Sequence, residues 1–327
     1  MKTIPEKIIK SILNFRLGGI QKAIEKFHAN KELFLPDSQN KIEEIINNDI
    51  SDKELLYEIL SHDYLRPAFV IQDGNFALPK DHPWHPLLSM YKPKIRKAIG
   101  SVGIFEIVRN AKKYPSGTGW LLSEDLVVTN QHVTEVFCEK VRGKFRIKKG
   151  FEKLTIDFNE EFDRIHDYEF RITDVVHVEE DDTSLYDHTP DIAILRVEKI
   201  NKNGEKLPPP LKLYNKPLRV NQPIAIIGFP SADYKLPLKR KRIFNNIYDV
   251  KRLQPGLIKK IKMLYDFDFQ HDCATLVGNS GSPVIDIQSG RVVGTHFAGS
   301  LNVFEGYAVR IEAVSYTHLT LPTTPYV

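Results

Sequence analysis

The spacing of apolar side chains divides the chain into two parts with different periods. Through residues 1–64, isoleucine, leucine and phenylalanine recur at intervals of three and four, which is typical of helices that bury one face. From Ser101 onwards, short apolar runs alternate with turn residues, which is typical of an all-β barrel or sandwich. We therefore expect a small helical domain over residues 1–64 and a mainly β domain that begins at residue 100.

Apolar stripes support the helical domain. The simplest interpretation is a small bundle whose stripes form its own core. A second interpretation is an adaptor that docks a protein partner, and the sequence leaves both open. The stripes are Ile4, Ile8, Ile12 and Phe15, then Ile20, Ala23, Ile24 and Phe27, then Ile42, Ile45 and Ile46, and finally Leu55, Leu56, Ile59 and Leu60 after a capping box of Ser51 and Glu54.

Residues 65–99 are expected to connect the two parts. Asp73-Gly74 is a turn signal between apolar runs and predicts a hairpin. A helix follows, with apolar positions from Leu87 to Ile99. His82 and His85 each precede a proline, so we expect turn and packing roles for them and not metal binding.

The β part contains candidate chemistry in the order histidine, aspartate, serine. His132 ends the run Thr129-Asn130-Gln131-His132, Asp191 precedes an apolar strand, and Ser280 lies in Gly278-Asn279-Ser280-Gly281-Ser282-Pro283. A serine hydroxyl is a poor nucleophile unless a base takes its proton and a third group orients that base. An imidazole that titrates near neutral pH suits the base. Asp181, Asp182 and Asp187 compete with Asp191 for the orienting role.

Together these segments resemble the trypsin-like serine peptidases, which have the chymotrypsin fold. The resemblance spans residues 100–313 and also includes Gly117-Thr118-Gly119-Trp120. It implies two six-stranded antiparallel β-barrels, with His132 as general base, Asp191 as its orienting partner and Ser280 as nucleophile. It also implies an oxyanion hole made by the backbone N–H groups of Gly278 and Ser280.

Further positions around the serine and the pocket suggest a branch of that family. Digestive members carry aspartate immediately before the serine, whereas this chain has Asn279, so we expect no activation by a new N-terminal amine. The turn is closer to bacterial and glutamyl-endopeptidase-like members, in which a threonine and a histidine bind an acidic substrate side chain. Thr275 and His296 stand at corresponding places, and Ala274 offers no carboxylate for lysine or arginine. The alternative is a pocket wall without charge selection.

Composition limits the partners. A net charge of +4 does not demand a nucleic-acid partner, and we interpret Glu179–Asp182 and Lys239–Arg242 as solvated loops. No apolar run reaches membrane-spanning length, and the start of the chain predicts a charged helix, not a signal peptide. With only Cys138 and Cys273, both taken as reduced, we expect a cytoplasmic protein. We expect no metal or other cofactor.

The resemblance therefore predicts a serine endopeptidase acting on polypeptides. Residues 242–256 and His271-Asp272 also resemble bacterial peptidases of which some are joined to or encoded beside nucleases, which suggests an intracellular defence effector by analogy. The alternative is a peptide-binding scaffold that uses the groove without turnover. An intact triad argues against the scaffold, because binding alone does not require it.

Residues 314–327 break the β pattern. Back-translation of Val314–Thr323 resembles a transposase adapter of sequencing libraries. We expect the gene fragment to end near Ala313, which truncates the peptidase domain at its C-terminus, and the rest to be adapter read-through. Family members usually place a helix after a last pocket strand such as Gly306–Ile311, and we expect that helix to be missing.

Overall fold

The computed structural model describes residues 66–80, 82–164, 166–179, 189–232, 243–262, 266–299 and 305–312, together with Glu25 and Glu43. The expected helical domain over residues 1–64 lies outside the described residues apart from those two glutamates. The run Lys239–Arg242 and residues 314–327 also lie outside them.

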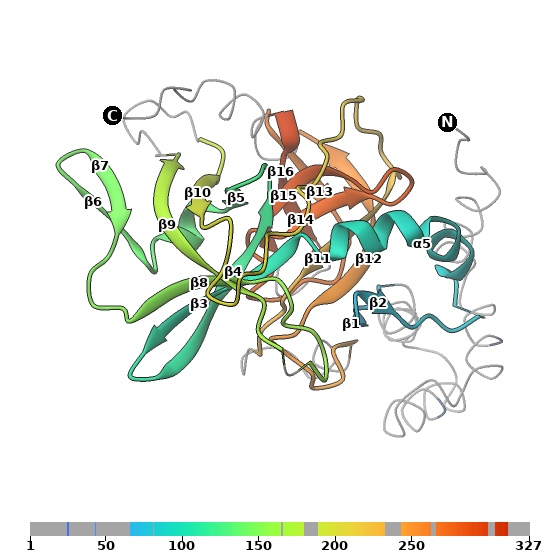
Figure 1. The fold of residues 1–327 in the computed structure, drawn as a ribbon. Coiled ribbons are helices and arrows are strands. Elements are labelled where there is room, and N and C mark those ends of the chain that lie inside the picture. The colour runs from blue at the N-terminus through green and yellow to red at the C-terminus, as the bar shows by residue number, and fades with distance from the viewer. Residues whose placement is uncertain are drawn as a thin grey trace.

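Six antiparallel strands form a first closed barrel, in the order β10-β5-β4-β3-β8-β9. Alternate side chains on each strand point inward, so Phe105, Ile107 and Ile156 join one apolar core. The strands are β3 (Val102–Arg109), β4 (Lys112–Leu121), β5 (Leu126–Thr129), β8 (Lys153–Asp157), β9 (Glu169–Val178) and β10 (Ala193–Val197). A hairpin of β6 (Cys138–Val141) and β7 (Lys144–Ile147) projects from this barrel in Figure 1.

A second barrel closes in the order β11-β14-β15-β16-β13-β12, because β12 also pairs with β11. Its interior includes Ile224, Ile226 and Val284, which are fully buried. The strands are β11 (Pro223–Gly228), β12 (Arg252–Ile261), β13 (Asp268–His271), β14 (Pro283–Asp286), β15 (Arg291–Gly299) and β16 (Gly306–Arg310). Two six-stranded antiparallel barrels of the chymotrypsin type are therefore confirmed.

The connector packs on the second barrel. β1 (Phe69–Gln72) and β2 (Asn75–Phe76) form the predicted hairpin, with Asp73 and Gly74 both at positive φ in its turn. β1 also pairs with β12, so it extends the second sheet, which the sequence did not indicate. Helix α5 (His85–Ile99) lies beside β11 and β12 in Figure 1. It buries Leu87, Leu88 and Ile95 in an apolar cluster to which both barrels contribute.

One local prediction was wrong. The residues after the histidine predict a helical turn over Val133–Cys138, whereas helix α6 (Gln131–Thr134) contains the histidine and Cys138 begins β6. Phe137 and Cys138 are buried in the core of the first barrel, which draws the chain out of the helix after Thr134. No helix in the described part of the chain is long and apolar enough to cross a membrane.

Candidate active site

His132 and Asp191 meet at one end of the first barrel, although they lie 59 positions apart. The Nδ1 atom of His132 is 2.6 Å from Oδ2 of Asp191, and the backbone N–H of His132 donates to Oδ1 at 3.1 Å. Because the carboxylate accepts at Nδ1, that nitrogen carries the proton and Nε2 stays an acceptor. The imidazole is 42% exposed, so Nε2 is accessible.

A buried asparagine fixes the aspartate in place. The Nδ2 atom of Asn130 donates to the backbone carbonyl of Asp191 at 2.7 Å. Asn130 follows β5 and Asp191 precedes β10. These two strands pair with each other, and Ala193 lies opposite Thr129. Asn130 belongs to the histidine motif, but the sequence gives no role for it; its position two residues before His132 was the only signal.

The loop that carries Ser280 is held by the first barrel through Thr118. The N–H of Thr118 donates to the Ser280 carbonyl at 2.9 Å, and its hydroxyl donates to the Gly278 carbonyl at 2.7 Å. Gly281 has φ +85°, and a Cβ at that position would overlap the carbonyl of Thr118. Glycine is thus required where the serine loop crosses the other barrel.

Two N–H groups of this loop are left available. The N–H groups of Asn279, Gly281 and Ser282 donate to carbonyls within the chain. Within the described residues, those of Gly278 and Ser280 have no acceptor. These are the two donors that the sequence predicts for the oxyanion hole, and donors of that kind stabilise the charge that develops on a carbonyl under attack.

Gly117 lies where the serine loop approaches the histidine helix. A Cβ on Gly117 would be 2.9 Å from Cγ1 of Val133 and 3.4 Å from the carbonyl oxygen of Ser280. The side-chain hydrogen bonds of the described residues do not include one from Ser280 Oγ to His132 Nε2. Catalytic hydrogen bonds of this kind often tighten only when substrate is bound.

Two histidines form a buried pair in the second barrel. The Nε2 atom of His271 lies 3.1 Å from Nδ1 of His296, and the N–H of Cys273 donates to Nδ1 of His271 at 3.3 Å. His271 therefore carries its proton on Nε2 and donates to Nδ1 of His296, which leaves the His296 proton on Nε2.

Both histidines of the pair are neutral at physiological pH. Burial lowers the pKa of His271 to about 3, and burial together with the neighbouring His271 holds the pKa of His296 well below its usual value. The backbone of Tyr307, which favours a proton on His296, only partly offsets this. The structure therefore favours an uncharged His296 that can only act through hydrogen bonds.

The predicted pocket residues lie close to this pair. A Cβ on Gly299 would be 3.1 Å from the Thr275 hydroxyl and 3.9 Å from Cε1 of His296, so both side chains border one space. Ala274 is fully buried, and its carbonyl accepts from Gln254 at 2.5 Å.

The family described as "Trypsin-like peptidase domain" matches residues 117–294, which is more than half of the 327-residue chain. The chain belongs to the trypsin-like peptidase family. Among proteins with curated descriptions, none matches it.

Solved structures similar to this trypsin-like peptidase include the active form of the Rv3671c protease from M. tuberculosis, with 20% identity, 73% of this chain and 88% of that chain covered, and a TM-score of 0.46. The HtrA-type protease AlgW with tripeptide shows 17% identity over 71% of this chain and 63% of that chain, with a TM-score of 0.46. A serine endoprotease from Yersinia pestis shows 17% identity over 71% and 66%, with a TM-score of 0.47.

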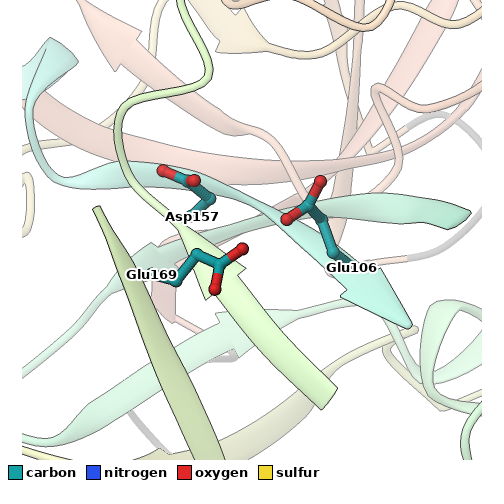
Figure 2. Close-up of side chains that lie close together, drawn as sticks. All are labelled: Glu106, Asp157 and Glu169. Carbon is teal, nitrogen blue, oxygen red and sulfur yellow. The ribbon is translucent and has the colours of Figure 1, made fainter. Parts of the chain in front are cut away.

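The trypsin-like peptidase also gathers three carboxyl groups on the outer face of its first barrel. Figure 2 shows Glu106 on β3, Asp157 on β8 and Glu169 on β9, all buried, with oxygen atoms within 4.8 Å of one another. Lys113 lies 3.0 Å from Glu106 and also pairs with Glu169, to which Lys153 is bound as well. The two ammonium groups supply the positive charge there, so we interpret the cluster as an ion-pair network.

Burial is the main influence on the pKa of two of the three carboxyl groups in this cluster. It raises the pKa of Glu106 to about 7 and raises that of Asp157. Burial acts in the same direction on Glu169, but its hydrogen bonds from Lys113 and Lys153 outweigh it and lower the pKa. Elsewhere, Cys138 and Cys273 are both buried and form no disulfide, and burial raises the pKa of the Cys138 thiol to about 12.

Proposed function

We propose that this chain is a serine endopeptidase that cleaves polypeptides through an acyl-enzyme on Ser280. The observation that carries the proposal is the short hydrogen bond between His132 Nδ1 and Asp191 Oδ2, at 2.6 Å. It lies beside a loop with two N–H groups that have no acceptor in the described part of the chain. Within the family, an orienting aspartate, a basic imidazole and available N–H donors are the parts that acyl transfer requires.

In the proposed reaction, Nε2 of His132 takes the proton of Ser280 as Oγ bonds to the peptide carbonyl carbon. The N–H groups of Gly278 and Ser280 hold the resulting oxyanion. The C–N bond then breaks as His132 returns the proton to the leaving amine. A water molecule that gives its proton to His132 attacks the ester, and release of the acid restores the hydroxyl of Ser280.

We further propose that the residue before the scissile bond is acidic. The Thr275 hydroxyl and the imidazole of His296 border the pocket, while Ala274 supplies no carboxylate to hold a basic side chain. Hydrogen bonds to a charged acceptor are stronger than those to a neutral one, so a neutral imidazole is sufficient to favour glutamate. This would place the chain in the glutamyl-endopeptidase-like branch.

The same proposal includes a cellular location and a protein partner. Two buried cysteines that form no disulfide suit a reducing cytoplasm. The analogy with nuclease-linked bacterial peptidases supports an intracellular effector, with residues 1–64 as the place where a protein partner docks.

A fluorophosphonate probe tests the reaction, since it bonds only to an activated serine. We expect the wild type to be labelled and Ser280→Ala not to be. Ser282→Ala is the matched control, because Ser282 lies in the same motif, is fully buried and has a hydroxyl without a hydrogen-bond partner. A folded wild type that binds peptides but takes no label would instead support the scaffold.

A further inference from the structure

Two buried cations stand side by side at the start of β12 and serve different parts of the molecule. Lys251 donates to the carbonyls of Ile99 and Phe158 and lies 3.6 Å from Glu161. Arg252, its neighbour, is buried as well. Consecutive strand residues point to opposite faces, so the two cations have separate surroundings.

Arg252 joins three segments of chain. Its guanidinium donates to the carbonyls of Ala68 at 2.5 Å, Phe244 at 2.7 Å and Ile247 at 2.7 Å, and it lies over the ring of Phe244 at 5.6 Å. The planar fork of arginine suits several fixed acceptors at once. Burial lowers the pKa of Arg252 to about 10, so the group remains charged at neutral pH.

The segments that Arg252 joins lie directly behind the proposed substrate pocket. Ala68, Ile243 and Phe244 pack in one apolar cluster with Ala274 and Leu276. The carbonyl of Leu276 accepts from the N–H of Asn279, next to the nucleophile.

Two further contacts hold the same loop. Gln254, two residues along the strand and on the same face as Arg252, donates to Ala274. Arg66 reaches Asp272 with Nη2 and Oδ2 at 3.9 Å. The pocket loop is thus held from behind by the connector at one end and by β12 at the other.

We infer that Arg66–Val70 act as a strap, seated on Arg252, that sets the conformation of residues 272–282. Arg252 is in this sense a positioning residue, since it touches neither substrate nor triad. The inference rests on the proposed function for its effect on catalysis, but the seating itself can be measured without catalysis.

Hydrogen exchange on the full chain tests the seating. Arg252→Met removes the three hydrogen bonds and keeps apolar bulk, and Lys251→Met is the matched control one position away. We expect peptides covering residues 272–282 to exchange at least tenfold faster in Arg252→Met than in Lys251→Met. The control should instead loosen the segment around Phe158. Equal exchange at residues 272–282 in both variants would overturn the inference.

A milder variant guards against loss of the fold. Arg66→Gln removes the positive charge that faces Asp272, at a partly exposed side chain, so we expect the variant to fold and to accelerate exchange at residues 272–282 by about threefold. Unchanged exchange there, in a folded protein, would also overturn the strap.

Catalysis supplies a second readout. Because a misplacement of about 1 Å costs roughly 10²-fold in rate, we expect Arg252→Met to lower kcat/KM for peptides by 10- to 100-fold. Lys251→Met, compared at equal fractions of folded protein, should lower it less than threefold. Equal losses would count against the strap. A wild type that takes no fluorophosphonate label would defeat the proposed function alone, since the exchange experiment still decides the strap.

Discussion

In the first barrel the candidate catalytic groups are held by side chains, whereas in the second they are held by the backbone. Asp191 and Asn130 orient His132 through carboxylate and amide atoms. The serine loop depends on glycines at positive φ and on carbonyls bound by Thr118. Substitutions in the first barrel should therefore change chemistry with little change in structure, and those in the serine loop should change both.

We expect the largest loss of activity from a substitution among the side chains that hold His132. Asp191→Asn keeps the shape of the side chain but favours the wrong tautomer of His132, so we expect kcat to fall about 10⁴-fold with little change in Tm. Asp125→Asn is the control, because Asp125 pairs with Arg196 at 2.7 Å on the same barrel. Similar losses of kcat in the two variants would contradict a special role for Asp191.

Gly281→Ala tests the role of the backbone in holding the loop that carries Ser280. The added Cβ would overlap the Thr118 carbonyl in a conformation with φ +85°, so we expect a lower Tm and, from displacement of the loop, roughly a 10²-fold loss of kcat/KM. Gly204→Ala imposes a similar φ of +79° but meets nothing within 4 Å. If both variants lost activity alike, backbone strain and not the crossing at Thr118 would be the cause.

The histidine pair sharpens the comparison, since here the second barrel uses side chains. We expect His296→Leu to lower kcat/KM by about 10–100-fold for substrates with glutamate before the scissile bond, because a hydrogen bond to a charged group is lost. The same variant should leave substrates with leucine at that position nearly unchanged. A uniform loss for both substrates would contradict selection of an acidic residue.

The smallest expected effect lies in the carboxyl cluster of the first barrel. Glu106 has a pKa of about 7 in the fold against 4.5 ordinarily, so the folded chain binds more protons between these values and stability falls as pH rises through them. The stability advantage of wild type over Glu106→Gln should therefore shrink between pH 5 and pH 8. We expect a change of a few degrees in the Tm difference.

Glu124→Gln controls for the general effect of pH, because Glu124 pairs with Lys199 at 3.2 Å on the exposed surface. Its Tm difference from wild type should stay constant over the same range. A constant difference for Glu106→Gln as well would contradict the raised pKa.

The sequence was sufficient to predict the two barrels and the contact between His132 and Asp191. Short alternating strands and motifs in a fixed order indicate a fold whose register then brings distant residues together. Thr118 and Asn130 were visible as parts of motifs, but their partners depend on how one barrel crosses the other.

The carboxyl cluster and Arg252 could not be predicted in the same way. Glu106, Asp157 and Glu169 alternate with apolar residues, as exposed positions on strands usually do, yet they are covered in the fold. Arg252 looks like a surface charge in the sequence. Periodicity shows which face a residue occupies but not what lies over that face.

The hydrogen bond from Arg252 to the carbonyl of Ala68 joins residues 184 positions apart. At about 5–20 residues per second of synthesis, roughly 10–40 s separate the emergence of the two from the ribosome. During translation the pocket would therefore be completed late, because the connector is synthesised before the second barrel on which it packs. A nascent chain would remain without a finished pocket until β12 and residues 272–282 had been made.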